Sequence, residues 1–288
     1  MKKMQYQKMF LLTLSLALIM GLSLTQLFAQ NPPQNVTYNQ STKTYEVKSV
    51  DNMHAVADAV NNGWNSLGYT FKLMADIGDT INPVKIPIGS FRPFKGTFDG
   101  DGWVVTVDYS NIGISVSSNS YVGLFGYTEN AIISNVTVKG KLGGNNCVGG
   151  VVGRGLNTTI INCSNFAYLK CDDITVVNIG GIIGFGEGRT IIKRCVNSGN
   201  IICNNSNEDN HVYYHDCYIG GIIGTARPNN RDWYNINPRI NSLVIEDCLN
   251  LGTIQGKHCI GGINGYTDVG TQIERCMNGG YILGDKYM

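Results

Sequence analysis

The chain has 288 residues, of which 36 are glycine and only 15% are charged, whereas about 25% is usual for charged residues. Lys plus Arg number 22 and Asp plus Glu number 21, which gives a formal charge of +1. This balance lacks the broad positive field that nucleic-acid binding uses, so we expect no nucleic-acid partner. Apolar residues make up 43%, which argues against disorder, and the glycines lack the Gly-X-Y period of collagen.

Residues 1–29 have the three-part pattern of a secretory signal peptide. Lysines up to Lys8 precede an apolar run from Phe10 to Leu24, and Ala29 provides a small residue at a cleavage point. The run has about fifteen residues, fewer than the ~20 of a membrane-spanning helix, so an N-terminal anchor is the less favoured alternative. The sequence predicts an exported protein, secreted or in the cell envelope (periplasm or outer surface), without stable membrane insertion after cleavage.

A short glycine motif recurs five times in the remainder of the chain. Successive copies end 27, 31, 40 and 41 residues apart. Glycine pairs disfavour helix, and the motif shows no helical period, so each repeat is expected to consist of short strands. The copies lie at residues 122–126, 148–153, 179–184, 219–224 and 260–265.

A second motif, I-x-x-[CV]-x-[NV]-x-[GA]-x-[IL], alternates with the first and also occurs five times. Its positions four, six, eight and ten share one face of a strand, whereas the opening Ile is out of phase, so a bend is expected between them. One such unit cannot bury its apolar face alone, but stacked units can, which predicts a parallel β-solenoid. A β-propeller is the alternative, but its blades need ~40–50 residues. The copies lie at 133–142, 160–169, 192–201, 245–254 and 273–282.

Stacking would align two columns of side chains, one of cysteine and one of asparagine. We expect both to point inward, with asparagine amides hydrogen-bonded along the axis; an asparagine at a tight turn is the alternative. Export permits disulfides, but the favoured interpretation is that these cysteines are small buried residues and free thiols. Zinc is disfavoured because no C-x-x-C pair exists. The columns are Val136, Cys163, Cys195, Cys248, Cys276 and Val138, Asn165, Asn197, Asn250, Asn278.

The stretch Gly123-Leu-Phe-Gly126 resembles the GLUG motif of bacterial cell-surface and secreted proteins, frequent in gut Bacteroidales and found near the N-terminal region of IgA-specific metallopeptidases. The upstream segments Phe71–Ile77, Pro87–Gly89 and Phe94–Gly102 extend the resemblance to residues 45–284. It implies an all-β, right-handed parallel β-helix with a short N-terminal α/β cap, including a helix near 51–62, and a surface or adhesive role. It does not imply peptidase activity, because the chain has no H-E-x-x-H motif.

The resulting division is a signal peptide at 1–29, a linker at 30–44, an N-terminal cap region at 45–91 and GLUG-type repeats at 92–288. Parallel stacking is expected from about residue 92 onward.

No catalytic, metal or cofactor site is predicted. The stretch Gly180–Thr190 lacks the lysine and spacing of a phosphate loop. Asp99–Gly102 is interpreted as a hairpin turn rather than a calcium loop. Asp172 and Asp173 form an isolated carboxylate pair, which is weak support for polysaccharide chemistry. His211 and His215 follow a polar loop rather than a helical pattern, so metal binding is disfavoured there.

The two longest repeats carry extra residues at about 204–217 and 225–241, which flank the predicted strand Tyr218–Gly224. Insertions in solenoids often lie on the binding face, although the inserted aromatics could instead cover an apolar coil edge. The candidate ligand-binding residues are Tyr213, Tyr214, Arg231, Trp233 and Tyr234.

We therefore expect a non-enzymatic binding or adhesion protein that recognises a host or envelope protein or glycan, with its oligomeric state open. The alternatives are a polysaccharide-active β-helix enzyme, a lyase or hydrolase, and a fragment of a longer surface protein.

Overall fold

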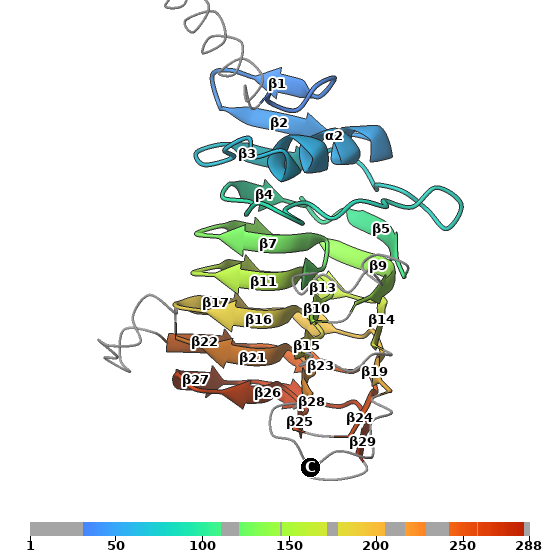
Figure 1. Ribbon diagram of the computed structural model, residues 1–288, viewed down its shortest axis with the longest axis vertical. Helices are drawn as coiled ribbons and strands as arrows, with labels where there is room; N and C mark the ends of the chain where they lie inside the picture. The colour runs from blue at the N-terminus through green and yellow to red at the C-terminus, as the bar shows by residue number, and fades with distance from the viewer. Residues whose placement is uncertain are drawn as a thin grey trace, which may run out of the picture.

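The computed structural model describes residues 31–110, 121–144, 146–171, 178–204, 217–228, 242–257 and 259–284. Its strands form four sheets in which successive coils of the chain lie one below another, as Figure 1 shows. The predicted all-β parallel β-helix is confirmed, and the propeller is excluded, because every pair of strands after β2 is parallel and in register. The predicted signal peptide lies outside the described residues and stays a prediction.

Sheet A has nine strands, and sheet B has ten on its two branches. Sheet A consists of β1 Thr37–Asn39, β2 Thr44–Val47, β3 Thr70–Leu73, β4 Thr97–Asp99, β8 Ile132–Ser134, β12 Thr159–Ile161, β17 Thr190–Lys193, β22 Ser242–Glu246 and β27 Gly270–Glu274. Sheet B consists of β5 Val104–Tyr109, β9 Thr137–Gly143, β13 Ser164–Asn165, β14 Tyr168–Cys171, β18 Val196–Asn197, β19 Ile201–Cys203, β23 Leu249–Asn250, β24 Ile254–Gly256, β28 Met277–Asn278 and β29 Ile282–Gly284.

The glycine motifs form the two smaller sheets, each with one strand from each of the five coils. Sheet C consists of β7 Phe125–Glu129, β11 Val152–Leu156, β16 Ile183–Glu187, β21 Ile223–Arg227 and β26 Asn264–Thr267. Sheet D consists of β6 Tyr121–Val122, β10 Cys147–Gly149, β15 Asn178–Gly180, β20 Tyr218–Gly220 and β25 Ile260–Gly261. The first glycines of the copies align along one axis, as predicted.

The N-terminal end combines a hairpin with one helix. β1 pairs with β2 in antiparallel fashion, and α2, Val50–Asn61, connects β2 to its parallel neighbour β3 (Figure 1). Ser49 caps the helix by accepting a hydrogen bond from the Asn52 N–H at 3.2 Å, and Val56 and Val60 are fully buried in the shared core. The helix expected near 51–62 is thus present, and parallel stacking begins at β2 and β3, upstream of residue 92.

A left-handed residue turns the chain from sheet A into sheet B in every repeat. It follows the strand that contains the opening Ile of the second motif, which is the bend that the sequence predicts. Asn and Asp tolerate this conformation better than Arg does. The five residues, with φ between 50° and 56°, are Asn135, Asn162, Arg194, Asp247 and Arg275.

The asparagine column points inward, as predicted. The Asn165 amide donates to Asn197 Oδ1 at 2.8 Å, Asn197 donates to Asn250 at 2.7 Å, and Asn250 donates to Asn278 at 2.6 Å. The first three are fully buried. Each amide also donates to the main-chain oxygen two residues later, as in the bond from Asn197 to Gly199 at 3.0 Å. The column therefore fixes both the coil stacking and the local turn.

The glycine pair and the asparagine form one packing unit. A Cβ added at Gly181 would collide with the Asn197 side chain and with the Gly221 main-chain oxygen. The first copy, Val122–Gly126, is one residue shorter and has no counterpart of this second glycine, and Val138 stands in the asparagine position. The two motifs therefore occur together because one makes room for the other. The remaining matched pairs are Gly150 with Asn165, Gly221 with Asn250 and Gly262 with Asn278.

The cysteine column also lies inside the solenoid, where Cys163 and Cys195 are fully buried and Cys248 is 2% exposed. Val136 precedes them in the first coil, also buried. The four cysteines of this column, Cys163, Cys195, Cys248 and Cys276, are free thiols, as expected, and seven of the nine cysteines in the chain are buried.

Two expectations about local structure are wrong. Asp99–Gly102 is not a hairpin turn: β4 belongs to sheet A and β5 pairs with β9 of sheet B, so the turn is a corner between sheets. Left-handed Asp101 and Gly102 produce it, and Asp99 accepts from the Asp101 N–H at 3.0 Å. The predicted single strand Tyr218–Gly224 is two strands, β20 and β21, because the glycine pair bends the chain between sheets D and C.

Candidate functional site

The five predicted ligand-binding residues, Tyr213, Tyr214, Arg231, Trp233 and Tyr234, lie outside the described residues, as do Asp172, Asp173, His211 and His215. The described strands do define where the two inserted segments join the solenoid. The first ends at Cys217, directly before β20. The second begins later than predicted, since 225–227 continue β21 in register with β16. Both segments therefore adjoin Tyr218 and Arg227 of one coil.

Sheets C and D carry a partly exposed surface of aromatic and arginine side chains, which we call the aromatic–arginine face. Its residues lie just before the first glycine of the motif or just after the last, and equivalent residues of successive coils are stacked. The turn between the sheet D strand and the sheet C strand of each coil brings the two groups together. The face consists of Tyr121, Tyr127, Arg154, Phe185, Glu187, Tyr218, Arg227 and Tyr266.

Arg154 organises the upper part of this face. Its guanidinium lies 5.2 Å and 5.1 Å from the ring centroids of Tyr121 and Tyr127, within the range of cation–π attraction. Nε and Nη2 both donate to Glu187 Oε2, at 3.0 and 2.6 Å, and Nη1 donates to the Tyr121 hydroxyl at 2.6 Å. The Glu187 side chain is only 3% exposed. Arg154 thus neutralises a buried carboxylate and connects the coil of Tyr121 and Tyr127 to the coil of Glu187.

The lower part repeats this arrangement around Arg227. Its guanidinium lies 5.9 Å from the ring centroids of both Tyr218 and Tyr266, and Nε is 3.2 Å from Asp268 Oδ2. The two tyrosine rings are 4.7 Å apart. Tyr218 is 8% exposed, whereas Tyr266 is 36% exposed. The lower part therefore presents a tyrosine ring and a partly exposed arginine next to the attachment points of both inserted segments.

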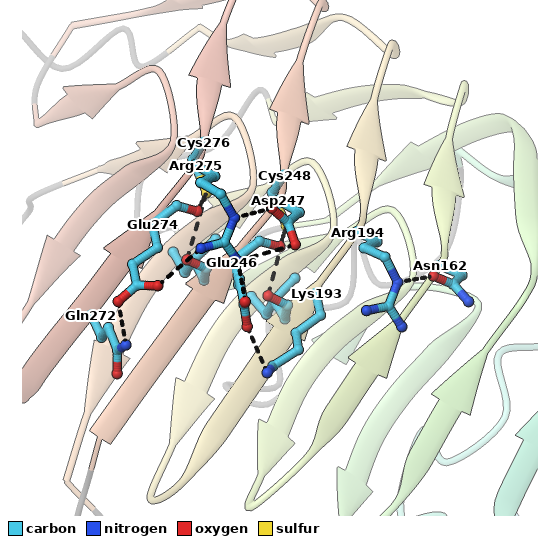
Figure 2. Close-up of polar contacts among 12 residues, drawn as sticks. Asn162, Lys193, Arg194, Glu246, Asp247, Cys248, Gln272, Glu274, Arg275 and Cys276 are labelled. Carbon is cyan, nitrogen blue, oxygen red and sulfur yellow. Dashed lines mark hydrogen bonds and ion pairs between the residues drawn. The ribbon is translucent and has the colours of Figure 1, made fainter.

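A second polar cluster follows the corner between sheets A and B, and we call it the charged corner: Lys193, Glu246, Asp247, Glu274 and Arg275. Figure 2 shows these side chains meeting across neighbouring coils. Lys193 Nζ is 2.6 Å from Glu246 Oε2, and Arg275 Nε is 2.6 Å from Asp247 Oδ1. Arg275 also pairs with Glu246 and, at 3.2 Å, with Glu274. Each carboxylate of the charged corner therefore has a basic partner.

The charged corner is unsuited to proton transfer. Lys193 and then Arg275 hold the pKa of Glu246 below its usual value, and Arg275 does the same for Asp247. A general acid needs a raised pKa, which comes from burial or a like charge. In sheet D, next to Tyr121, burial raises the pKa of the Cys147 thiol to about 12, which keeps it protonated at neutral pH. Within the described ranges, no three His, Cys, Asp or Glu side chains are placed to hold a metal ion.

Sequence reasoning missed both clusters, although each has a signal in the repeats. Extending the alignment one residue past the last glycine of the motif gives Tyr127, Arg154, Phe185, Thr225 and Tyr266, which are in register in sheet C. The second and third positions of the other motif read Lys-Arg, Glu-Asp and Glu-Arg in three consecutive coils, which is the charged corner.

Among the residues that the structure describes, no helix has both the length and the apolar character to cross a bilayer.

Comparison with known proteins gives two matches. The GLUG motif family matches residues 144–167, which contain β10 to β13 and thus most of one coil. A stretch of 162 residues is 27% identical to Halomucin of Haloquadratum walsbyi. This stretch is 51% of the chain but only 2% of Halomucin, so the chain spans a small fraction of that relative's length. The chain thus contains a GLUG motif within a parallel β-helix and is similar over half its length to part of Halomucin.

Proposed function

We propose that this protein is an exported, surface-exposed or secreted binding protein that recognises a host or envelope protein or glycan and has no enzymatic activity. The GLUG motif at 144–167 and the similarity to Halomucin support a surface or adhesion role. The sequence pattern of residues 1–29 supports export. A stack of hydrogen-bonded coils suits such a role because it presents side chains of several repeats on one extended surface.

The observation that carries the proposal is the lower part of the aromatic–arginine face. Tyr266 is 36% exposed, and the Arg227 side chain beside it is 37% exposed. Tyrosine and arginine are enriched at binding hot spots, and aromatic rings provide flat apolar area with a polar edge. The inserted segments, which carry Tyr213 and Trp233 in the sequence, leave the solenoid from the same coil. Ligand contact is therefore assigned to the lower part of the aromatic–arginine face and to the two segments next to it.

The charges of the described residues favour binding over polysaccharide chemistry. Glycoside hydrolysis uses two carboxyl groups whose environments separate their pKa values, one raised to act as acid. The exposed carboxylates of the charged corner are all paired with Lys193 or Arg275, and the resolved pKa shifts among them are downward. A polysaccharide lyase or hydrolase is therefore the less favoured, second candidate.

The test is a glycan and protein array probed with the mature protein, followed by affinity measurements with the best ligand. Tyr266→Ala and Trp233→Ala should each weaken binding at least tenfold, because a hot-spot aromatic contributes about 2 kcal/mol or more. Tyr281→Ala is the matched control: it removes a 77% exposed ring from the same coil as Tyr266 and should leave affinity unchanged.

The enzyme alternative has its own readout. The protein is incubated with a panel of polysaccharides and assayed for new reducing ends and for unsaturated products. Turnover would contradict the non-enzymatic proposal. If neither Tyr266→Ala nor Trp233→Ala changes the affinity, the ligand binds elsewhere than at the lower part of the aromatic–arginine face and the adjoining segments.

A further inference from the structure

Two cysteines meet at the point where the first inserted segment joins the solenoid. Cys203 is the last residue of β19 in sheet B, and Cys217 directly precedes β20 in sheet D. Their sulfur atoms are 3.4 Å apart, with the Cys203 thiol donating, although the residues are 14 positions apart in the chain. They are 3% and 2% exposed. The pair therefore faces across a corner between two sheets, with 204–216 forming the connection.

The other buried thiols are arranged differently. In the cysteine column, the Cys163, Cys195 and Cys248 thiols each donate to a main-chain oxygen at 3.3 Å. These residues stack in register along the axis, so their Cα–Cβ bonds run parallel, which is unfavourable for a disulfide even at a suitable distance. Cys203 ends a strand of sheet B and Cys217 precedes a strand of sheet D, so the two are not stacked in register, and their sulfur atoms are 3.4 Å apart. Only a small further approach of the two sulfurs is needed for a bond.

We propose that Cys203 and Cys217 form a disulfide site that links the last residue of β19 to the residue directly before β20. The oxidant is a small-molecule or protein disulfide of the exported compartment. One cysteine thiolate attacks that disulfide, forms a mixed disulfide and releases one thiol. The second cysteine then attacks the mixed disulfide, which forms the Cys203–Cys217 bond and releases the second thiol. The protein loses two electrons and two protons, and the oxidant is reduced to two thiols.

The position of the pair determines which thiols react. Cys203 ends β19 and Cys217 directly precedes β20, so fraying of these strand ends exposes the pair without separating coils. The neighbouring Cys171 and Cys217 thiols, together with burial, raise the pKa of Cys203, so the exchange is slow at neutral pH. Cys171 is in register with Cys203 but donates to the Gly144 main-chain oxygen at 2.8 Å. Cys217 is therefore the partner of Cys203.

The link depends on export but not on the proposed ligand. It would join sheet B to sheet D covalently at this corner. Loss of ligand binding and loss of the disulfide are separate outcomes, because the disulfide is detected without any ligand.

The experiment treats the folded, mature protein with glutathione disulfide at mildly alkaline pH, blocks the remaining thiols by alkylation and maps peptides by mass spectrometry without reduction. The number of alkylated cysteines should fall by two relative to untreated protein, with one linked pair of peptides that contains Cys203 and Cys217. Cys217→Ser should abolish that linked pair, whereas Cys195→Ser, the matched buried control, should retain it.

A linked pair that contains Cys163, Cys195 or Cys248, or a Cys171–Cys203 link in the unmutated protein, would overturn the proposal. So would an unchanged thiol count in protein that circular dichroism shows to be folded. The thiol count of the unmutated protein decides the question even if Cys217→Ser fails to fold.

Discussion

Replacing Asn197 by alanine tests the asparagine column at a fully buried position with an asparagine bonded on either side. The side chain accepts a hydrogen bond from Asn165 at 2.8 Å and donates to Asn250 at 2.7 Å and to the Gly199 oxygen at 3.0 Å. Alanine removes all three bonds and leaves a donor of Asn165 and the Asn250 oxygen without these partners inside the solenoid. A buried polar group that loses its partner costs about 1–3 kcal/mol. We expect the free energy of unfolding to fall by about 4 kcal/mol.

Asn278→Ala is the matched control, because Asn278 ends the column on the exposed side of the last coil. It accepts one bond from Asn250, whose amide also donates to the Gly252 oxygen at 3.1 Å, and water can reach the site. We expect a loss of about 1 kcal/mol. Guanidinium unfolding followed by far-UV circular dichroism measures both variants. If the two variants lose equal stability, the column does not hold the coils together and the reasoning is refuted.

Three further predictions concern the other contacts. Gly181→Ala places a methyl group against the Asn197 side chain and should lower the free energy of unfolding by about 2–3 kcal/mol. Gly279→Ala, in the exposed last coil, is the control and should change it by less than about 1 kcal/mol. Equal losses would contradict the claim that the glycine pair makes room for the asparagine. Arg154→Met leaves Glu187 buried and unpaired and should lower the free energy of unfolding by about 3 kcal/mol or more. Adding Glu187→Leu should restore part of this loss. A double variant less stable than Arg154→Met would count against this account. Because the pKa values of Glu246 and Asp247 are lowered, the charged corner stabilises the fold at neutral pH, and this contribution is lost as pH falls below about 4. Between about pH 7 and pH 3, the melting temperature of Arg275→Ala should therefore drop less than that of the unmutated protein. Identical drops would refute the assignment.

The fold could be predicted because its stabilising contacts repeat. Equivalent residues of successive coils contact one another, so the requirement for a buried Ile, a small residue and an asparagine recurs in the sequence. Asn165, Asn197 and Asn250 are separated by 32 and 53 residues, yet each bonds the next. The out-of-phase Ile also predicted the corner, since a strand cannot turn its parity without a bend.

The candidate site could not be predicted in the same way, because its residues differ from coil to coil. Arg154 pairs with Glu187 only through the register of β11 and β16, and both positions vary: Arg154 is stacked between Tyr127 and Phe185, and Glu187 between Leu156 and Arg227. The prediction of a hairpin turn at Asp99–Gly102 was wrong for a related reason: a turn sequence specifies local dihedral angles but not which strands the turn connects. Left-handed Asp101 and Gly102 serve a sheet-to-sheet corner as readily as a hairpin.

Parallel stacking also sets what this architecture provides per residue. Each coil advances the solenoid by one strand spacing, about 4.8 Å, whereas an extended chain covers that distance with two residues. The shortest coil uses 27 residues for this advance. Duplication of a coil therefore adds little axial length to the solenoid, but it adds a complete set of outward-facing side-chain positions. Variation among copies can then change what is displayed while the asparagine column stays the same, so selection on recognition and selection on folding act on different positions of each repeat.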